Sequence, residues 1–158
     1  MRWAEFERAA PQIAARGRER IERFDCVFVG TLRRDGGPRV NPVEAYVLEG
    51  RLLTNMMHRS LKALDLLRDP RVYVHTLVTS KSGREGELKL LGRAVVVEDE
   101  RLLAALSDLF WEKIQWRPPP ESSASSGTGV DAACTVTYRS AAMLLLNVNW
   151  MGRAPGGR

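Results

Sequence analysis

The sequence has few cysteines, few aromatic residues and no long hydrophobic segment. Its only two cysteines, Cys26 and Cys134, are too few and too far apart for a disulfide framework or a zinc knuckle. No apolar run approaches the ~20 residues that cross a bilayer. The first residues mix acids with apolar side chains and lack the apolar core of a signal peptide. We therefore expect a cytoplasmic protein that is not embedded in a membrane and has no metal site.

Positive charge is only mildly in excess. The chain has 24 Lys and Arg against 19 Asp and Glu, and only three tyrosines. Nucleic-acid-binding proteins usually combine a stronger basic stripe with base-reading or aromatic elements, so we expect no nucleic-acid partner. A small anionic ligand is the favoured partner, because a basic protein attracts phosphates of any kind.

Length and composition indicate one globular domain. The 158 residues are 44% hydrophobic and 27% charged, which is typical of a chain that buries a core. We assign residues 1–150 to a single domain, with a tail at 151–158. Within it, residues 117–131 are dominated by Pro, Ser and Gly and are expected to form a flexible loop.

The N-terminal segment, residues 3–23, has apolar residues at helical spacing. Pro11 and Gly17 interrupt the pattern, so we expect two short helices. Several arginines fall between the apolar positions, and we interpret them as a solvated face. They are Arg16, Arg18, Arg20 and Arg23.

From residue 24 the pattern changes to that of strands. Residues 24–32 form a nearly continuous apolar run, typical of a strand buried on both faces. Asp35-Gly36 and Glu49-Gly50 then predict two hairpin turns. The remaining elements are expected as strands at 39–48 and 51–55, a helix at 60–68, strands at 71–79 and 87–98, a helix capped near Asp99, and a hairpin at 133–138 and 143–149.

The helix at 60–68 has Ser60 as a candidate N-cap, and Leu61, Leu64 and Leu67 lie on one of its sides. Long apolar strands in antiparallel succession, with small helices between them, favour a closed barrel over an open sheet. The predicted class is mainly β with flanking helices (α+β).

The most informative segment for function is the passage from the strand at 51–55 into that helix. The strand end delivers Thr54, and the helix start presents unpaired amides together with Arg59, Ser60 and Lys62. Free N–H groups and the positive end of the helix dipole favour a phosphate. An ordinary capped helix with surface cations remains the alternative.

A second segment, Arg39 to Pro42, lies early in the second strand. Pro42 removes a ladder donor, which indicates an edge, a bulge or a contact with something other than a strand. Arg39 and Asn41 alternate to the same side and are expected to reach the same anion. No convincing nucleophile–base pair is present, so no catalytic residue is assigned; this suits a protein whose cofactor performs the chemistry.

The order and spacing of short motifs agree with one known family. They are Thr31-Leu32, Asp35-Gly36, Pro38-Arg39-Val40, Gly50-Arg51-Leu52, Lys62, Leu66, Asp69-Pro70-Arg71-Val72, Gly92-Arg93-Ala94 and Val97-Glu98-Asp99. Across about residues 1–112 the chain resembles the pyridoxamine 5′-phosphate oxidase-like split β-barrel flavoproteins, and most of all their small actinobacterial members.

The resemblance implies an antiparallel six- to seven-stranded split β-barrel and a homodimer that holds FMN, or the deazaflavin F420, between its subunits. It implies an oxidoreductase that transfers hydride to or from a small-molecule substrate, with NAD(P)H as a candidate partner. By position it implies Arg39, Val40, Asn41 and Pro42 along the ribityl chain and ring, Thr54, Arg59, Ser60 and Lys62 at the phosphate, and Trp150 reaching the partner subunit's flavin.

Two positions depart from the oxidases of this family. Leu61 precedes Lys62 where those oxidases have an Arg-Lys pair, and Glu44 replaces a basic residue in the second strand. We therefore do not expect pyridoxamine phosphate as the substrate. Two variants of the function stay open: an F420-dependent reductase, whose acidic cofactor tail would suit Arg16, Arg18, Arg20 and Arg23, and a flavin carrier without turnover.

Overall fold

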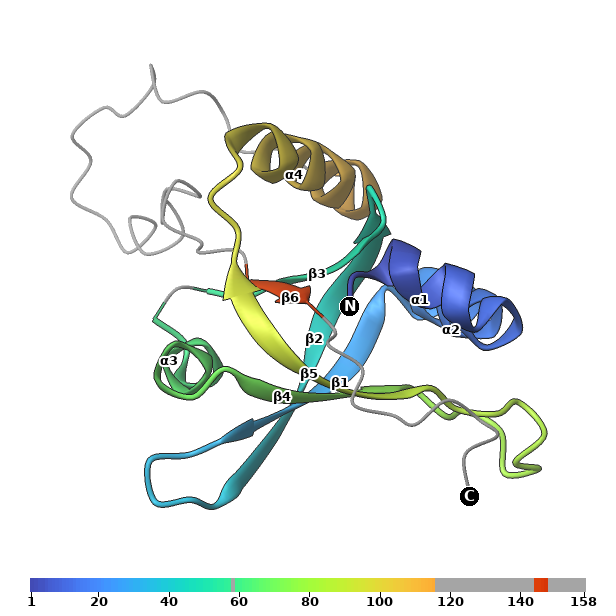
Figure 1. The fold of residues 1–158 in the computed structure, drawn as a ribbon, viewed down its shortest axis with the longest axis horizontal. Coiled ribbons are helices and arrows are strands. Elements are labelled where there is room, and N and C mark those ends of the chain that lie inside the picture. The colour runs from blue at the N-terminus through green and yellow to red at the C-terminus, as the bar shows by residue number, and fades with distance from the viewer. Residues whose placement is uncertain (58, 116–143, 148–158) are drawn as a thin grey trace.

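The chain folds as an antiparallel barrel with helices around it (Figure 1), seen in a computed structural model that describes residues 1–57, 59–115 and 144–147. The order β1-β2-β3-β6-β5-β4 closes on itself, since β4 pairs with β1 and β6 joins β3 to β5. This confirms the barrel expected from the sequence. The strands are β1 Cys26–Leu32, β2 Pro38–Leu48, β3 Arg51–Asn55, β4 Arg71–Thr76, β5 Lys89–Val96 and β6 Leu144–Asn147.

Four helices in the described part of the chain flank the barrel. They are α1 Trp3–Ala9, α2 Pro11–Phe24, α3 Leu61–Arg68 and α4 Glu100–Ile114. Pro11 opens α2, where its missing N–H costs nothing, and Ser60 and Asp99 cap α3 and α4 with their side chains. In Figure 1, α3 lies on the opposite side of the barrel from α1 and α2. No helix in the described residues is long and apolar enough to span a bilayer.

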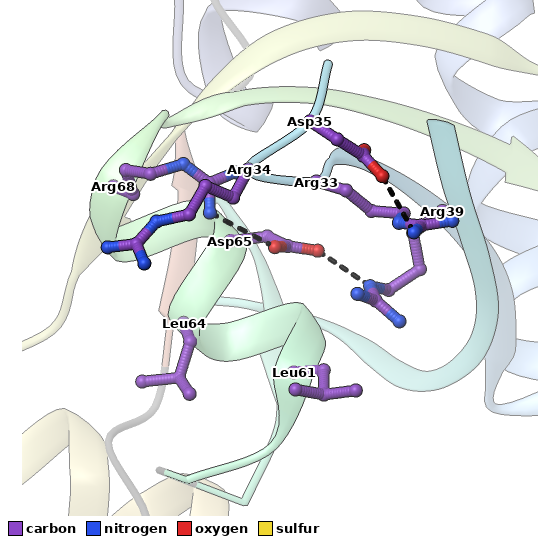
Figure 2. Close-up of a pocket in the computed structure, with 8 residues that line it drawn as sticks. All are labelled: Arg33, Arg34, Asp35, Arg39, Leu61, Leu64, Asp65 and Arg68. Atoms are coloured by element: carbon purple, nitrogen blue, oxygen red, sulfur yellow. Dashed lines mark hydrogen bonds and ion pairs between the residues drawn. The ribbon is translucent and has the colours of Figure 1, made fainter. Parts of the chain in front are cut away.

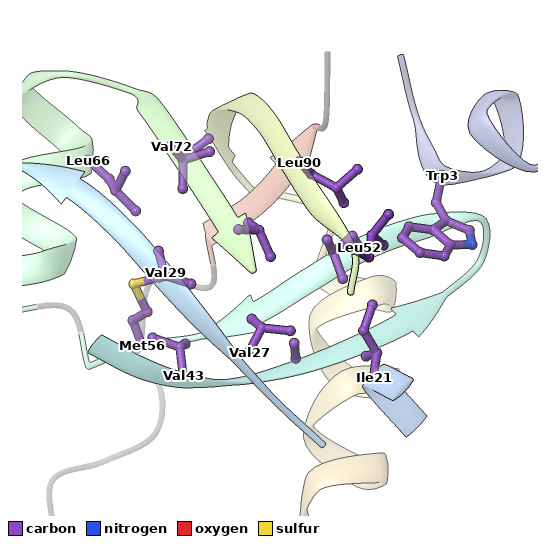
Figure 3. Packing of buried hydrophobic residues seen from close by; sticks show 14 of the residues in the cluster. Trp3, Ile21, Val27, Val29, Val43, Leu52, Met56, Leu66, Val72 and Leu90 are labelled. Carbon is purple, nitrogen blue, oxygen red and sulfur yellow. The ribbon is translucent and has the colours of Figure 1, made fainter. Parts of the chain in front are cut away.

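The hydrophobic core fills the barrel interior (Figure 3). Alternate residues of β1 point inward, so Val27 and Val29 are wholly buried. Trp3 and Ile21 from the N-terminal helices extend this core. A second cluster packs α4 against side chains from β2 and β3, and its buried members are Tyr46, Leu53, Val97, Leu102, Leu106, Phe110 and Trp111.

The expectation that the first strand is buried on both faces is wrong. Phe28 in β1 keeps 39% of its surface exposed, while its neighbours Val27 and Val29 are buried. The apolar run arises because the outward positions of this strand are also hydrophobic. The hydrophobic residues on the outward face of β1 therefore do not belong to the barrel core.

Several other expectations compare directly with the described residues. The strand expected at 71–79 ends at Thr76, and the one expected at 87–98 spans Lys89–Val96. Of the last hairpin, β6 is present within the expected 143–149. The loop at 117–131, the strand at 133–138 and the tail at 151–158 lie outside the described residues.

Candidate functional site

A cleft of about 740 Å³ lies between the β1–β2 hairpin and α3 (Figure 2). We call it the α3 cleft. Four of its residues are arginines and two are aspartates, which leaves a surplus of two positive charges beside two leucines. The lining residues are Arg33, Arg34, Asp35, Arg39, Leu61, Leu64, Asp65 and Arg68. A basic cleft with an apolar wall suits an anion that also has an apolar part.

Asp65 is the buried centre of this cleft, with 4% of its surface exposed. Its Oδ2 accepts hydrogen bonds from Thr31 Oγ1 at 3.0 Å and from Arg39 Nε at 2.7 Å. Its Oδ1 accepts one from Arg68 Nη1 at 3.3 Å. The carboxylate therefore ties α3 to both β1 and β2 and determines the direction of the Arg39 guanidinium.

The ionisation of Asp65 follows from these partners. Burial alone would raise the pKa of its carboxyl, but the hydrogen bonds from Arg39 and Thr31 and the charge of Arg39 outweigh burial and lower that pKa. Asp65 is thus an anion at neutral pH, and two of the cleft's arginines are already partly neutralised by it.

The tip of the hairpin leaves one cation uncommitted. Gly36 adopts a φ of +82°, and Asp35 accepts a hydrogen bond from the Gly37 amide at 2.9 Å while Arg33 pairs with the same carboxylate at 2.7 Å. Within the described residues, Arg34 is exposed and has no ion-pair or hydrogen-bond partner. Arg34 is therefore the arginine of this cleft most readily offered to a ligand.

The N-terminus of α3 has open donors. Ser60 Oγ accepts from the Ala63 amide at 3.4 Å, and the Ser60 carbonyl accepts from Leu64. Among the described residues, nothing accepts from the amides of Leu61 and Lys62. The Lys62 side chain is half-buried and makes no ion pair there either. The segment expected to hold a phosphate thus presents two free amides and a lysine.

The other predicted ligand residues are divided among different surroundings. Thr54 is wholly buried, paired in the sheet with Ala45 and Leu144, so it faces no solvent in this chain. Arg59 is exposed beside the start of α3. Trp150 lies outside the described residues. The structure therefore groups Ser60 and Lys62 at one helix end and separates Thr54 from them.

The β2 residues are split by strand alternation. Arg39 and Asn41 stand opposite the buried Thr31 and Val29 of β1 and share their inner face. Val40, 62% exposed, and Pro42 point outward. A single ligand in contact with all four has to reach both faces of the strand.

Sequence reasoning missed Arg33, Arg34, Asp65 and Arg68 as site residues. Arg33 and Arg34 directly precede the Asp-Gly turn, which places them at a hairpin tip. Asp65 could have been recognised as a candidate site residue from the sequence, since it is an acid among the leucines of a short helix. Two of its three partners, Thr31 and Arg39, come from strands more than 25 positions earlier in the chain, a juxtaposition that no local pattern contains.

The outward face of the sheet carries an apolar row. Register places Val40 of β2 opposite Gly30 of β1, Gly30 opposite Tyr73 of β4, and Tyr73 opposite Leu91 of β5. Leu91 is 55% exposed and Tyr73 36%. We call this row, with the neighbouring Phe28, the outer sheet face. Contiguous exposed apolar area of this kind marks an interaction surface.

Comparison with known proteins gives the same fold. A putative pyridoxamine 5′-phosphate oxidase from Listeria innocua has 19% identity, covers 81% of this chain and 86% of its own, and superposes with a TM-score of 0.55. The heme storage protein HutZ from Vibrio cholerae has 17% identity, coverages of 87% and 88%, and a TM-score of 0.56. An F420 reductase has 17% identity, coverages of 82% and 89%, and a TM-score of 0.50.

At such identities these likenesses show the fold alone. No curated protein matches the chain. The family model described as pyridoxamine 5′-phosphate oxidase, however, matches residues 13–130, well over half of the sequence. Together with the antiparallel barrel, that match confirms the family expected from the sequence: the chain belongs to the pyridoxamine 5′-phosphate oxidase family.

Proposed function

We propose that the chain is an FMN-binding oxidoreductase that transfers hydride to or from a small molecule. The observation that supports this most is the start of α3, where among the described residues nothing accepts from the amides of Leu61 and Lys62, and where Lys62 itself contributes a cation. Open amides at a positive helix end, next to a cation, form a site that favours a phosphate dianion. Because the chain belongs to the pyridoxamine 5′-phosphate oxidase family, we infer that this phosphate is the one carried by a flavin.

The residues around this point fit a flavin mononucleotide. Arg34 and the surplus positive charge of the α3 cleft offset the phosphate charge, and outward-facing Val40 and Pro42 offer apolar contact to a ring. When bound, the flavin supplies the hydride-transfer chemistry. This chain's own residues bind the phosphate, orient the ring and exclude water from one of its sides. Thr54 is too deeply buried to belong to this set unless the chain rearranges.

We also propose a homodimer formed through the outer sheet face. An exposed apolar row does not stabilise an isolated barrel, and this one includes Val40, Tyr73 and Leu91. A second copy of the chain is the partner that the family favours for this surface. A dimer would place residues of a partner subunit opposite Val40 and Pro42, so that the flavin is held from both sides. Sedimentation equilibrium tests this directly, because a monomer mass contradicts it.

Two alternatives are separated by the colour and the reduction of the purified protein. Flavin absorbance indicates FMN, whereas a colourless preparation that takes up F420 indicates the deazaflavin; an F420 reductase is among the proteins with this fold. Anaerobic mixing with NAD(P)H then separates an enzyme from a carrier, since flavin in a carrier is not reduced at a useful rate.

The phosphate site is tested by Lys62→Ala. We expect the affinity for FMN to fall by about 1.5–3 kcal/mol, the range for a hydrogen bond to a charged group. Lys81→Ala is the matched control, because Lys81 is an exposed lysine outside the α3 cleft. Fluorescence titration of the apoprotein measures both. Equal affinities of Lys62→Ala and the parent protein for FMN would contradict the assignment of the phosphate site to the start of α3.

A further inference from the structure

A second cleft, of about 340 Å³, lies between α2 and the connection from β4 to β5. We call it the α2 cleft. Its side of the barrel is opposite to that of α3, as Figure 1 shows for the two helices. The residues that line it are four arginines and two glutamates: Arg16, Glu19, Arg20, Arg23, Arg84 and Glu85. The sequence pattern predicts that the arginines of this helix lie on a solvent-exposed face, and for Arg20 that prediction is wrong.

Arg20 is buried, with 8% of its surface exposed. Its Nη2 donates to the Leu77 carbonyl and to Glu85 Oε2, the latter at 2.9 Å. Its Nε is buried and has no hydrogen-bond partner among the described residues. Burial of an unsatisfied N–H is costly, and such groups are rare in folded proteins. Arg20 is therefore a guanidinium whose hydrogen-bonding capacity is incompletely used.

Glu85 is held in place from a second direction. Its carboxylate accepts from the Thr79 amide at 3.1 Å and from the Thr79 hydroxyl at 3.0 Å. These hydrogen bonds, with that from Arg20, lower the pKa of Glu85, so it is ionised at neutral pH. Arg20 and Glu85 neutralise one another and fasten the β4–β5 connection to α2.

The rim of the cleft keeps an unbalanced positive charge. Arg16, Arg23 and Arg84 are exposed, and within the described residues none of them has an ion-pair partner. Against these three arginines stands only Glu19, which leaves a surplus of two positive charges. Arg16, Arg20 and Arg23 share one side of α2 because they are spaced by four and three residues.

Arg18, on the same helix, shows that this arrangement is not general. It pairs with Glu7 at 2.6 Å and with Glu22 at 3.3 Å, and it does not line the cleft. Of the four arginines of α2, the two that have no acidic partner among the described residues, Arg16 and Arg23, both line the α2 cleft. Like charges held together destabilise each other, and an anion between them removes that repulsion.

We propose that the α2 cleft is a binding site for a small ligand that carries at least two oxoanion charges, as phosphates or as carboxylates. Planar guanidinium groups bind both kinds of oxoanion through paired hydrogen bonds. The cleft volume of about 340 Å³ accommodates a small ligand with two such groups, and the buried Arg20 forms a fixed part of the cleft lining. The site is separate from the α3 cleft and does not depend on a bound flavin.

The test uses inorganic pyrophosphate and citrate as probes, titrated calorimetrically at low salt into the full chain. We expect at least one probe to bind, and Arg16→Gln/Arg84→Gln to weaken its binding about tenfold or more, because charge-assisted hydrogen bonds are lost. Both arginines are exposed, so this variant keeps the fold. Binding of pyrophosphate alone identifies a phosphate ligand, and binding of citrate alone identifies a carboxylate ligand.

The control is Arg8→Gln/Lys81→Gln, which removes the same charge from an N-terminal helix and from the same β4–β5 connection but outside the cleft. We expect this pair to change the affinity less than about twofold, because neither side chain lines the cleft and solvent screens exposed charges outside it. Failure of both probes to bind overturns the proposal. So does an equal loss of affinity in the two double variants, because the attraction would then be a property of net charge.

Discussion

The two clefts are built on buried charges of opposite sign. In the α3 cleft a buried carboxylate, Asp65, accepts hydrogen bonds from Thr31, Arg39 and Arg68. In the α2 cleft a buried guanidinium, Arg20, donates to Leu77 and Glu85, and its Nε has no hydrogen-bond partner in the part of the chain that the structure describes. Each cleft nonetheless has two more positive than negative residues in its lining.

The difference shows that an arginine count does not measure how many arginines can bind a ligand. Around Asp65, two of the four arginines pair with the carboxylate. Arg39 links β2 to α3, whereas Arg68 pairs within α3 and also donates to the Leu32 carbonyl of β1. Around Arg20, the buried pair is internally neutral, and none of the three rim arginines has an ion-pair partner within the described residues. The α2 cleft is smaller, yet more of its arginines lack an ion-pair partner among the residues that the structure describes.

The largest effect is expected from Asp65→Asn. It leaves Arg39, 25% exposed, without its anion, and breaking a buried pair in this way costs about 3 kcal/mol of unfolding free energy. Asp35→Asn is the control, since it breaks the exposed Arg33–Asp35 pair and is expected to cost less than about 1 kcal/mol. Urea denaturation compares the two. Similar losses would mean that Asp65 does not hold α3 in place.

A smaller loss of stability is expected from Glu85→Gln, because Arg20 then keeps only a neutral side-chain acceptor beside the Leu77 carbonyl. The same change leaves Arg20 uncompensated and is expected to strengthen the binding of pyrophosphate or citrate in the α2 cleft. Glu19→Gln removes the same charge from the rim without touching Arg20. If the two variants lose equal stability in urea, the Arg20–Glu85 pair does not fasten the β4–β5 connection.

The smallest effect is the pH dependence due to Asp65. Its pKa in the folded chain lies below the ordinary 3.8, so the folded state binds this proton less tightly than the unfolded state does. The contribution is therefore fully present above pH 3.8 and is lost as the pH falls through the lowered pKa. The unfolding free energy of Asp65→Asn should fall less steeply over this acid range than that of the parent. Parallel profiles would assign the acid sensitivity to other carboxylates.

Local signals predicted the elements well because their causes are local. Pro11 at a helix start, the Asp35-Gly36 turn and the Ser60 cap each depend on neighbouring backbone groups. The site was predicted less completely. Ser60 and Lys62 lie at the start of α3, where the Leu61 and Lys62 amides have no acceptor among the described residues, but the acid that organises the adjacent cleft, Asp65, binds Thr31 and Arg39 from distant parts of the chain.

Periodicity also left the direction of α3 undecided. Leu61, Leu64 and Leu67 share one side, as the spacing indicates, but that side is exposed, at 61%, 47% and 48%. Ala63 and Leu66 are the residues packed into the core. A hydrophobic stripe reports only that residues share a face; which face meets the barrel depends on how the helix is anchored, and here Asp65 is part of that anchor.

By itself, the sequence determined the family, the order of helices and strands, and the turns and caps between them, since these depend on residues close in the chain. Only the tertiary structure decided which charged residues are buried. It brought Asp65 to Arg39 and Arg20 to Glu85 from distant segments, and burial strengthens such pairs because water no longer screens them. From that sorting come the two clefts and the difference between them.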